Sequence, residues 1–167
     1  YMYGPHGGTP LTEATPLNGR GSRSTTRVQM TRELFEAHNR GIVRAASVRA
    51  ADLFGPHVTE SLVGESFFKA LLAGKPAQVF ANPDLPHSVS FVHDVGQALV
   101  NVGADERALG QAWLAPNAPT VTLRQFAAVA GEALGTTPQL NALPRIATRL
   151  VLPLLALTVP ALRVTQM

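Results

Sequence analysis

The sequence predicts an α/β protein, because segments with the apolar spacing of helices alternate with short apolar segments typical of buried strands. Of the 167 residues, 46% are apolar and 15% are charged, which suits one core of ordinary size and lies outside the range of disordered proteins. The chain contains no cysteine, so disulfides, thiolate nucleophiles and cysteine-based zinc sites are excluded. A cytoplasmic location is therefore the default expectation.

The charge and hydropathy of the sequence argue against several classes of partner. The net charge is only +3, and the basic residues are scattered from Arg20 to Arg163, which speaks against nucleic acid. The five histidines show no HxxxH or HExxH spacing, so no metal site is expected. The most apolar stretch, residues 146–164, is interrupted by prolines and arginines and is too short to span a bilayer. We expect it to pack on a protein surface and not in a membrane.

The first third of the chain is typical of a long loop, a helix and a strand. Residues 3–23 are rich in Gly, Pro, Thr and Asn, and a loop of this length usually serves a site. Next, residues 24–26 (Ser-Thr-Thr) offer an N-cap for a helix that ends at residues 39–41 and has an inward face of Val28, Leu34, Phe35 and His38. Residues 42–48 then indicate a short buried strand, closed by turn residues 54–56, and this order suggests a βαβ crossover.

The rest of the chain continues the alternation. Thr59 can cap a helix that residues 74–76 stop, and its apolar residues recur at helical spacing: Leu62, Val63, Phe67, Ala70 and Leu71. Strands are expected at residues 77–81, 89–92 and 111–115. Asp94 is placed as the N-cap of the helix that follows the second of these strands. Thr122 and Gln125 have the spacing of a capping box, which predicts a last helix ending at Gly135.

Four segments carry a resemblance that covers most of the chain. Tyr3-Gly4 precedes a loop with acidic and proline residues, and residues 48–56 contain an Arg, an Asp and then Phe-Gly-Pro. Residues 89–99 join a strand to a helix that opens with Asp-Val, and residues 113–133 open a helix at Thr122. Their order and spacing resemble the C-terminal half of extended short-chain dehydrogenases/reductases of the NAD-dependent epimerase/dehydratase family.

This resemblance implies a partial Rossmann-like fold, the C-terminal strands and helices of a doubly wound parallel sheet, with a small α/β substrate-binding domain. Residues 1–56 would belong to the dinucleotide-binding domain and residues 57–167 mainly to the substrate-binding domain, with residues 87–103 able to return to the Rossmann-like sheet. It also implies NAD or NADP as cofactor, a small-molecule substrate and a homodimer as one arrangement of the intact protein. The glycine-rich turn that grips the dinucleotide in this family does not occur in the chain.

The resemblance gives three cofactor-binding candidates, Tyr3, Arg27 and Arg49. Family members carry a Tyr-x-x-x-Lys pair at the start of the helix expected here after residue 23, and alignment on that helix puts Arg23 at the Tyr position and Arg27 at the Lys position. An arginine can keep the positive charge and the ribose contact, but it cannot donate and recover a proton near neutral pH. Two arginines on a solvated first turn are the alternative interpretation.

Asp52 and His87 are the substrate-binding candidates. Asp52 follows an expected strand, where family members present a side chain to the substrate, although a turn-capping aspartate is equally consistent with its position. His87 stands where sugar-nucleotide members usually have an arginine that pairs with the diphosphate. A neutral imidazole binds a diphosphate poorly, so the sequence argues against a nucleotide sugar as substrate.

These observations favour a fragment of an NAD(P)-dependent oxidoreductase or epimerase/dehydratase. Its reaction would transfer a hydride between the nicotinamide and a carbon that bears a hydroxyl or carbonyl group. Two alternatives remain open at this point: a non-catalytic dinucleotide- or metabolite-binding protein of the same fold, and an inactive truncation.

Overall fold

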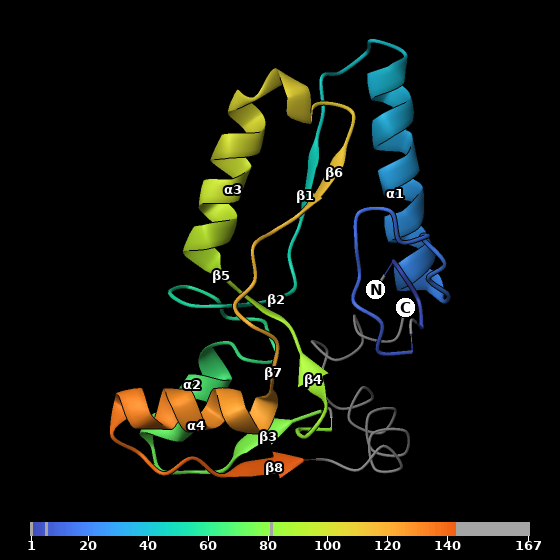
Figure 1. Ribbon diagram of the computed structural model, residues 1–167. Coiled ribbons are helices and arrows are strands. Elements are labelled where there is room, and N and C mark those ends of the chain that lie inside the picture. Colours follow the sequence, from blue (N-terminus) through green and yellow to red (C-terminus); the bar gives the residue numbers. More distant parts are fainter. Residues whose placement is uncertain (1, 6, 81, 143–167) are drawn as a thin grey trace, which may run out of the picture. The chain divides into compact units, whose positions relative to one another are not determined.

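The computed structural model describes residues 2–5, 7–80 and 82–142, which form two compact units (Figure 1). Unit 1 contains the residues up to Arg49 together with Gly96–Ala115, and unit 2 contains Ala50–Val95 together with the described residues from Pro116 onward. Within the described residues, the chain therefore passes from one unit to the other three times. The apolar stretch at residues 146–164 lies outside the described residues.

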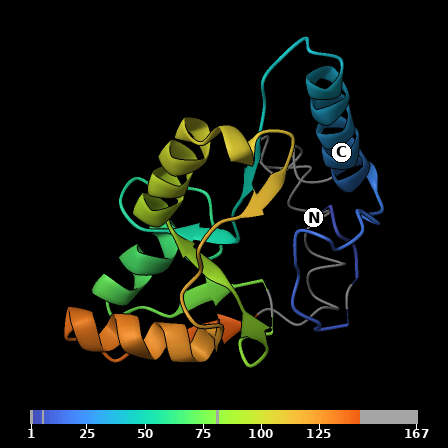
Figure 2. The same cartoon turned by 45° about the horizontal axis from the view of Figure 1, so that its top comes forward.

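Unit 1 is a parallel strand pair with helices on both sides. Strand β1 (Ser47–Arg49) pairs with β6 (Ala112–Leu114), and Ser47 lies opposite Ala112. Helix α1 (Ser22–Asn39) and the part of helix α3 (Val92–Ala104) that begins at Gly96 lie on opposite sides of this pair (Figures 1 and 2). Parallel strands covered by helices on both faces are the layering of an α/β protein.

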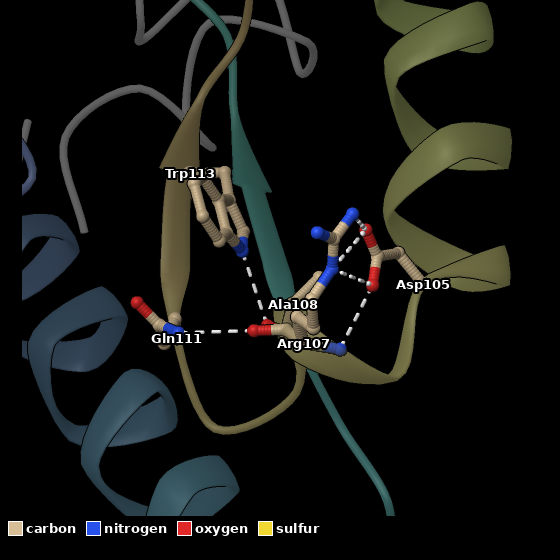
Figure 3. A network of polar contacts seen from close by, with 5 residues as sticks. All are labelled: Asp105, Arg107, Ala108, Gln111 and Trp113. Atoms are coloured by element: carbon tan, nitrogen blue, oxygen red, sulfur yellow. Dashed lines mark hydrogen bonds and ion pairs between the residues drawn. The ribbon is translucent and has the colours of Figure 1, made fainter.

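The connection from α3 to β6 is fixed by a network of polar contacts (Figure 3). The Asp105 carboxylate accepts the backbone N–H of Arg107 at 2.9 Å and so caps the short 3₁₀ helix η1 (Glu106–Ala108). The Arg107 guanidinium donates to the same carboxylate at 2.7 Å, which lowers the pKa of Asp105 to about 2. The Trp113 indole N–H donates to the Ala108 carbonyl at 3.1 Å, and this bond ties β6 to the turn that precedes it.

The described part of unit 2 combines helices α2 (Glu65–Leu72) and α4 (Leu123–Leu134) with three strand pairs. These helices accompany the parallel pairs β2 (Asp52–Phe54) with β5 (Val89–Phe91) and β3 (Ala77–Val79) with β8 (Leu140–Ala142). Strand β4 (Pro86–His87) pairs with β7 (Val121–Thr122) in the antiparallel direction.

The described hydrophobic core belongs to unit 2. A cluster of buried residues joins both helices to β3 and β5: Val63, Phe67, Leu71, Ala77, Val79, Val89, Leu123 and Ala127. Phe126 of α4 packs edge-on against Phe54 with ring centroids 5.3 Å apart, which ties β2 to the same core. The described part of unit 1 buries only Val28, Ala45, Ala108 and Ala115 among its apolar side chains.

The predicted α/β class is confirmed, and so is the capping box of the last helix. The Thr122 hydroxyl accepts the Gln125 N–H at 3.1 Å, the Gln125 side chain accepts the Thr122 N–H at 2.9 Å, and α4 ends at Gly135 in the left-handed conformation. No helix in the described ranges is both long enough and apolar enough to cross a bilayer.

Three predicted helix caps are wrong. Helix α1 begins at Ser22 after Gly21, so residues 24–26 lie inside it, and the Thr25 and Thr26 hydroxyls donate back to the Ser22 carbonyl. Helix α2 begins after Gly64 rather than at Thr59, because the intervening residues form a tight loop in which the Glu65 N–H donates to the Val58 carbonyl. Helix α3 begins at Val92, so Asp94 lies in its first turn.

The predicted strands are longer than the observed ones. Of residues 42–48, only those from Ser47 onward join a ladder, since β6 runs beside Ser47–Arg49 alone, and Ile42 is 66% exposed. Of the turn predicted at residues 54–56, Phe54 instead ends β2, because residues 52–54 pair along their length with β5. The turn begins at Gly55, whose φ of 121° favours glycine.

Candidate functional site

The two substrate-binding candidates are in direct contact in unit 2. Asp52 opens β2 opposite Val89, and His87 ends β4 opposite Val121. The Asp52 Oδ2 and His87 Nε2 atoms lie 2.7 Å apart, and the side chains are 44% and 33% exposed respectively. Asp52 is therefore not a turn-capping residue. Its carboxylate is oriented by a strand and bound to an imidazole that a second strand positions.

Neighbouring hydrogen bonds fix the strands that carry this pair. The buried Ser90 hydroxyl of β5 accepts the Ala51 N–H at 3.1 Å and donates to the side-chain oxygen of Asn117. Next to His87, the hydroxyls of Ser88 and Thr120 lie 3.1 Å apart, and this contact joins the residue after β4 to the residue before β7. The backbone beside both members of the Asp52–His87 pair is thus held in place.

This geometry sets what the pair can do chemically. When the His87 Nε2–H donates to Asp52, the other ring nitrogen, Nδ1, keeps its lone pair and can accept a proton. The carboxylate fixes the tautomer and stabilises the imidazolium that forms, as the aspartate does in a catalytic triad. With a neutral imidazole the pair carries one negative charge, so it does not attract a phosphate group.

Two of the three cofactor-binding candidates also lie together, in unit 1. Arg49 ends β1, and its Nη1 donates to the Tyr3 hydroxyl at 2.9 Å while its guanidinium carbon lies 5.6 Å from the centre of the Tyr3 ring. The Arg49 Nε is buried and has no hydrogen-bond partner among the described residues. A cation with an unused donor thus lies at the carboxyl end of a parallel strand, the edge at which open α/β sheets bind ligands.

Glu13 is a member of this region that the sequence did not single out. Its Oε1 accepts the N–H of Leu114, the last residue of β6, at 2.9 Å. This backbone hydrogen bond is the largest cause that lowers the pKa of Glu13, and the positive charge of Arg49 adds a smaller effect. Tyr3 and Glu13 therefore attach the N-terminal loop to the carboxyl ends of β1 and β6.

The remaining candidates lie on α1. Arg27 is exposed, and the described hydrogen bonds and ion pairs do not connect its side chain to Tyr3 or Arg49. Arg23, one turn earlier, is partly buried. Within residues 2–5, 7–80 and 82–142, no group of three His, Cys, Asp or Glu side chains could hold a metal ion.

Comparison with known proteins identifies the fold. No family model and no curated protein matches the sequence. Among solved structures, the chain is similar to an epimerase from Methanothermobacter thermautotrophicus, with a TM-score of 0.70 and 17% identity over 82% of this chain and 42% of that one. A dTDP-glucose 4,6-dehydratase from Bacillus anthracis, solved in complex with NAD, has a TM-score of 0.70 and 19% identity over 86% of this chain and 47% of that one.

A UDP-glucose 4-epimerase from Thermus thermophilus, also in complex with NAD, has a TM-score of 0.69 and 18% identity over 84% of this chain and 47% of that one. These likenesses show the fold, which is the C-terminal part of Rossmann-fold epimerases and dehydratases, as the sequence predicted. The chain spans less than half the length of each of these structures.

Proposed function

We propose that this chain belongs to an NAD(P)-dependent oxidoreductase or epimerase/dehydratase that acts on a small molecule bearing a hydroxyl or carbonyl group. The observation that carries the proposal is the Asp52–His87 pair, a proton-accepting arrangement on a fold shared with NAD-bound epimerases and dehydratases. In this proposal residues 1–56 contribute to the dinucleotide-binding domain and residues 57–167 mainly to the substrate-binding domain.

The residues at the carboxyl ends of β1 and β6 fit one side of a dinucleotide site. The positive charge of the Arg49 guanidinium would attract a phosphate of NAD(P), and a charge-assisted bond between these groups is a strong one. Tyr3 would lie beside it, since its hydroxyl is already bound to Arg49, and the exposed Arg27 is the third candidate. When bound, NAD(P) supplies the hydride acceptor or donor.

On the substrate side, His87 would take the proton of a substrate hydroxyl at Nδ1 and return it in the reverse direction. Asp52 would hold the ring and stabilise its protonated form. The pair would thereby supply a proton carrier that neither Arg23 nor Arg27 can replace, because a guanidinium stays protonated near neutral pH. Such a carrier favours catalysis over the alternative, a protein of this fold that binds a dinucleotide or metabolite without turnover.

Cofactor binding is tested with the intact protein that contains this chain. NADH and NADPH are titrated by calorimetry into the wild type, Arg49→Ala and Arg32→Ala, an exposed arginine of α1 that serves as the matched control. Loss of one charge-assisted hydrogen bond weakens affinity on the order of ten- to hundredfold, so Arg49→Ala should show this loss and Arg32→Ala should not. If the wild type binds neither nucleotide, the proposed function is wrong.

Turnover separates the enzyme from the non-catalytic binder. Formation of reduced nicotinamide is followed spectroscopically with a panel of alcohols for the wild type, His87→Gln and the control His93→Gln, an exposed histidine of α3. The proposal expects activity that falls about a hundredfold or more in His87→Gln alone. Nucleotide binding without turnover of any alcohol would favour the non-catalytic alternative.

A further inference from the structure

A cavity of about 510 Å³ opens in unit 2 at the carboxyl end of β2. One wall is the loop that follows β2, and the other is the outer face of α2, whose lining residues recur at helical spacing. The lining residues are Gly55, His57, Val58, Thr59, Glu65, Phe68, Lys69 and Leu72. Cavities of roughly 300–1,000 Å³ hold small organic ligands, so this one has the volume for such a molecule. It does not include Asp52 or His87.

The cavity walls are preformed. A Cβ added to Gly64 would lie 3.0 Å from the Val58 carbonyl oxygen, so the loop sits directly on the start of α2. At the other end of the loop, a Cβ on Gly55 would lie 2.8 Å from the Phe91 ring. His57 is held in the left-handed region at a φ of 64°, a conformation that costs energy for a residue with a side chain and that clusters at functional sites.

The lining of the cavity combines apolar side chains with one pair of opposite charges. Phe68, Leu72 and Val58 provide the apolar surface, and Leu72 remains 62% exposed. The Lys69 ammonium and the Glu65 carboxylate lie 2.5 Å apart and neutralise each other. His57 and Thr59 add hydrogen-bonding groups. Such a cavity favours an uncharged ligand with an apolar ring over an anion.

Asp52 and this cavity lie at the two ends of the short strand β2. Asp52 begins β2, and Gly55 follows its last residue, so the rise of a strand places their backbones about 10 Å apart. The Asp52–His87 pair also places the Asp52 carboxylate, a negative charge, 2.7 Å from the His87 ring nitrogen, and this carboxylate disfavours an anionic ligand group beside it.

From these observations we infer the substrate class: an uncharged, non-phosphorylated molecule that seats an apolar ring system in the β2–α2 cavity and presents a hydroxyl or carbonyl group to His87. This inference rests on the proposed function, whose reaction it makes specific. It assigns the cavity to the non-reacting part of the substrate, with Leu72 and Phe68 as its specificity-determining residues.

Binding of two probes to the intact protein, without nucleotide, tests the inference. Naphthalene methanol is the uncharged aromatic alcohol, and UDP-glucose is the phosphorylated alternative; both are titrated by calorimetry. Leu72→Gln places an amide in the cavity lining, and Leu85→Gln is the control, because Leu85 belongs to the same unit, is 59% exposed and does not line the cavity. Both substitutions are at exposed positions and should leave the fold intact.

The wild type should bind naphthalene methanol more tightly than UDP-glucose. Leu72→Gln should lower the affinity for naphthalene methanol about tenfold, because the contact with an apolar side chain is lost. Leu85→Gln should leave this affinity unchanged. Preference for UDP-glucose, no binding of naphthalene methanol, or equal losses in the two variants would overturn the inference. Because these titrations contain no nucleotide, their failure is distinct from failure of NAD(P) to bind.

Discussion

A partly exposed contact between a carboxylate and a histidine, such as Asp52–His87, matters more for reactivity than for stability. Water screens the charges, and holding two side chains in one geometry costs rotamer entropy. We therefore expect His87→Gln to change the free energy of unfolding by less than about 1 kcal/mol, even though it should abolish most turnover. Urea unfolding measures this directly. A loss of several kcal/mol would identify the pair as a structural element instead.

The hydrogen bond between the Glu13 carboxylate and the Leu114 amide depends on pH. Because the Leu114 amide lowers the pKa of Glu13 below its ordinary value of 4.5, the bond stabilises the fold above that pH, and the contribution is lost as the pH falls through the folded-state pKa. In the wild type we expect the NMR resonance of the Leu114 amide to titrate with a midpoint below 4.5.

The same resonance should not titrate in Glu13→Gln, which keeps an acceptor oxygen but has no acid to protonate. The Trp113 indole N–H, bound to the Ala108 carbonyl, provides the reference because its partner does not ionise. An unchanged titration of Leu114 in Glu13→Gln would mean that another group controls this amide.

At the scale of single residues, the sequence identified candidates but not their contacts. Asp52 and His87 are 35 positions apart, and Tyr3 and Arg49 are 46 apart, so each contact depends on how distant segments pair or pack. Glu13 was visible only as an acidic residue of a long loop, because its partner is a backbone amide 101 positions away, and every residue except proline supplies such an amide.

At the scale of elements, two threonines near helix starts have opposite roles. Thr122 accepts the Gln125 N–H at the start of α4, whereas the Thr25 hydroxyl inside α1 donates back to the preceding turn, where the carbonyls of Gly21 and Ser22 are its acceptors. Thr122→Ala should lower the free energy of unfolding by about 1 kcal/mol, which is the typical contribution of an N-cap. Thr25→Ala should be neutral or slightly stabilising, because such back-bonding does not support a helix. Thermal unfolding of both variants checks this, and equal losses would contradict it.

Two helical glycines make a second matched pair. A Cβ on Gly131 of α4 would lie 2.6 Å from the Pro138 ring, whereas a Cβ on Gly96 of α3 would meet no described atom within 4 Å. Gly131→Ala should therefore destabilise by about 1–3 kcal/mol through overpacking. Gly96→Ala should stabilise by about 0.5–1 kcal/mol through higher helix propensity. Denaturant unfolding gives the sign of the change in unfolding free energy for each variant, and a change of the same sign in both variants would refute this reasoning.

The elements that the sequence predicted well are those with local causes. The capping box and Gly135 act within a few residues of each other, and both are as predicted. The observed strands contain only two or three residues each, so their ends depend on where a distant partner begins, as β6 limits β1. The strands β4, β7 and β8 were missed because such short segments show no periodicity.

At the scale of the whole molecule, the two units differ in how many apolar side chains their described residues bury. Helix α2 buries Phe67 and Leu71 in the core of unit 2, whereas α1 buries only Val28. Local stability follows buried apolar contact, so in this 167-residue chain the Leu71 amide should exchange with solvent at least about tenfold more slowly than the Leu34 amide of α1. Hydrogen exchange followed by NMR decides this. Faster exchange at Leu71 would reverse the assigned order of stability.

The three passages of the chain between the units bear on how it folds during synthesis. The ribosome releases β1 long before its partner β6, because all of Ala50–Val95 is made in between. At ordinary elongation rates that interval is on the order of several seconds. Unit 2 is also incomplete until α4 and β8 emerge. Neither unit can therefore complete its strand pairs until these later segments have left the exit tunnel, so each unit keeps unpaired strands exposed for that interval.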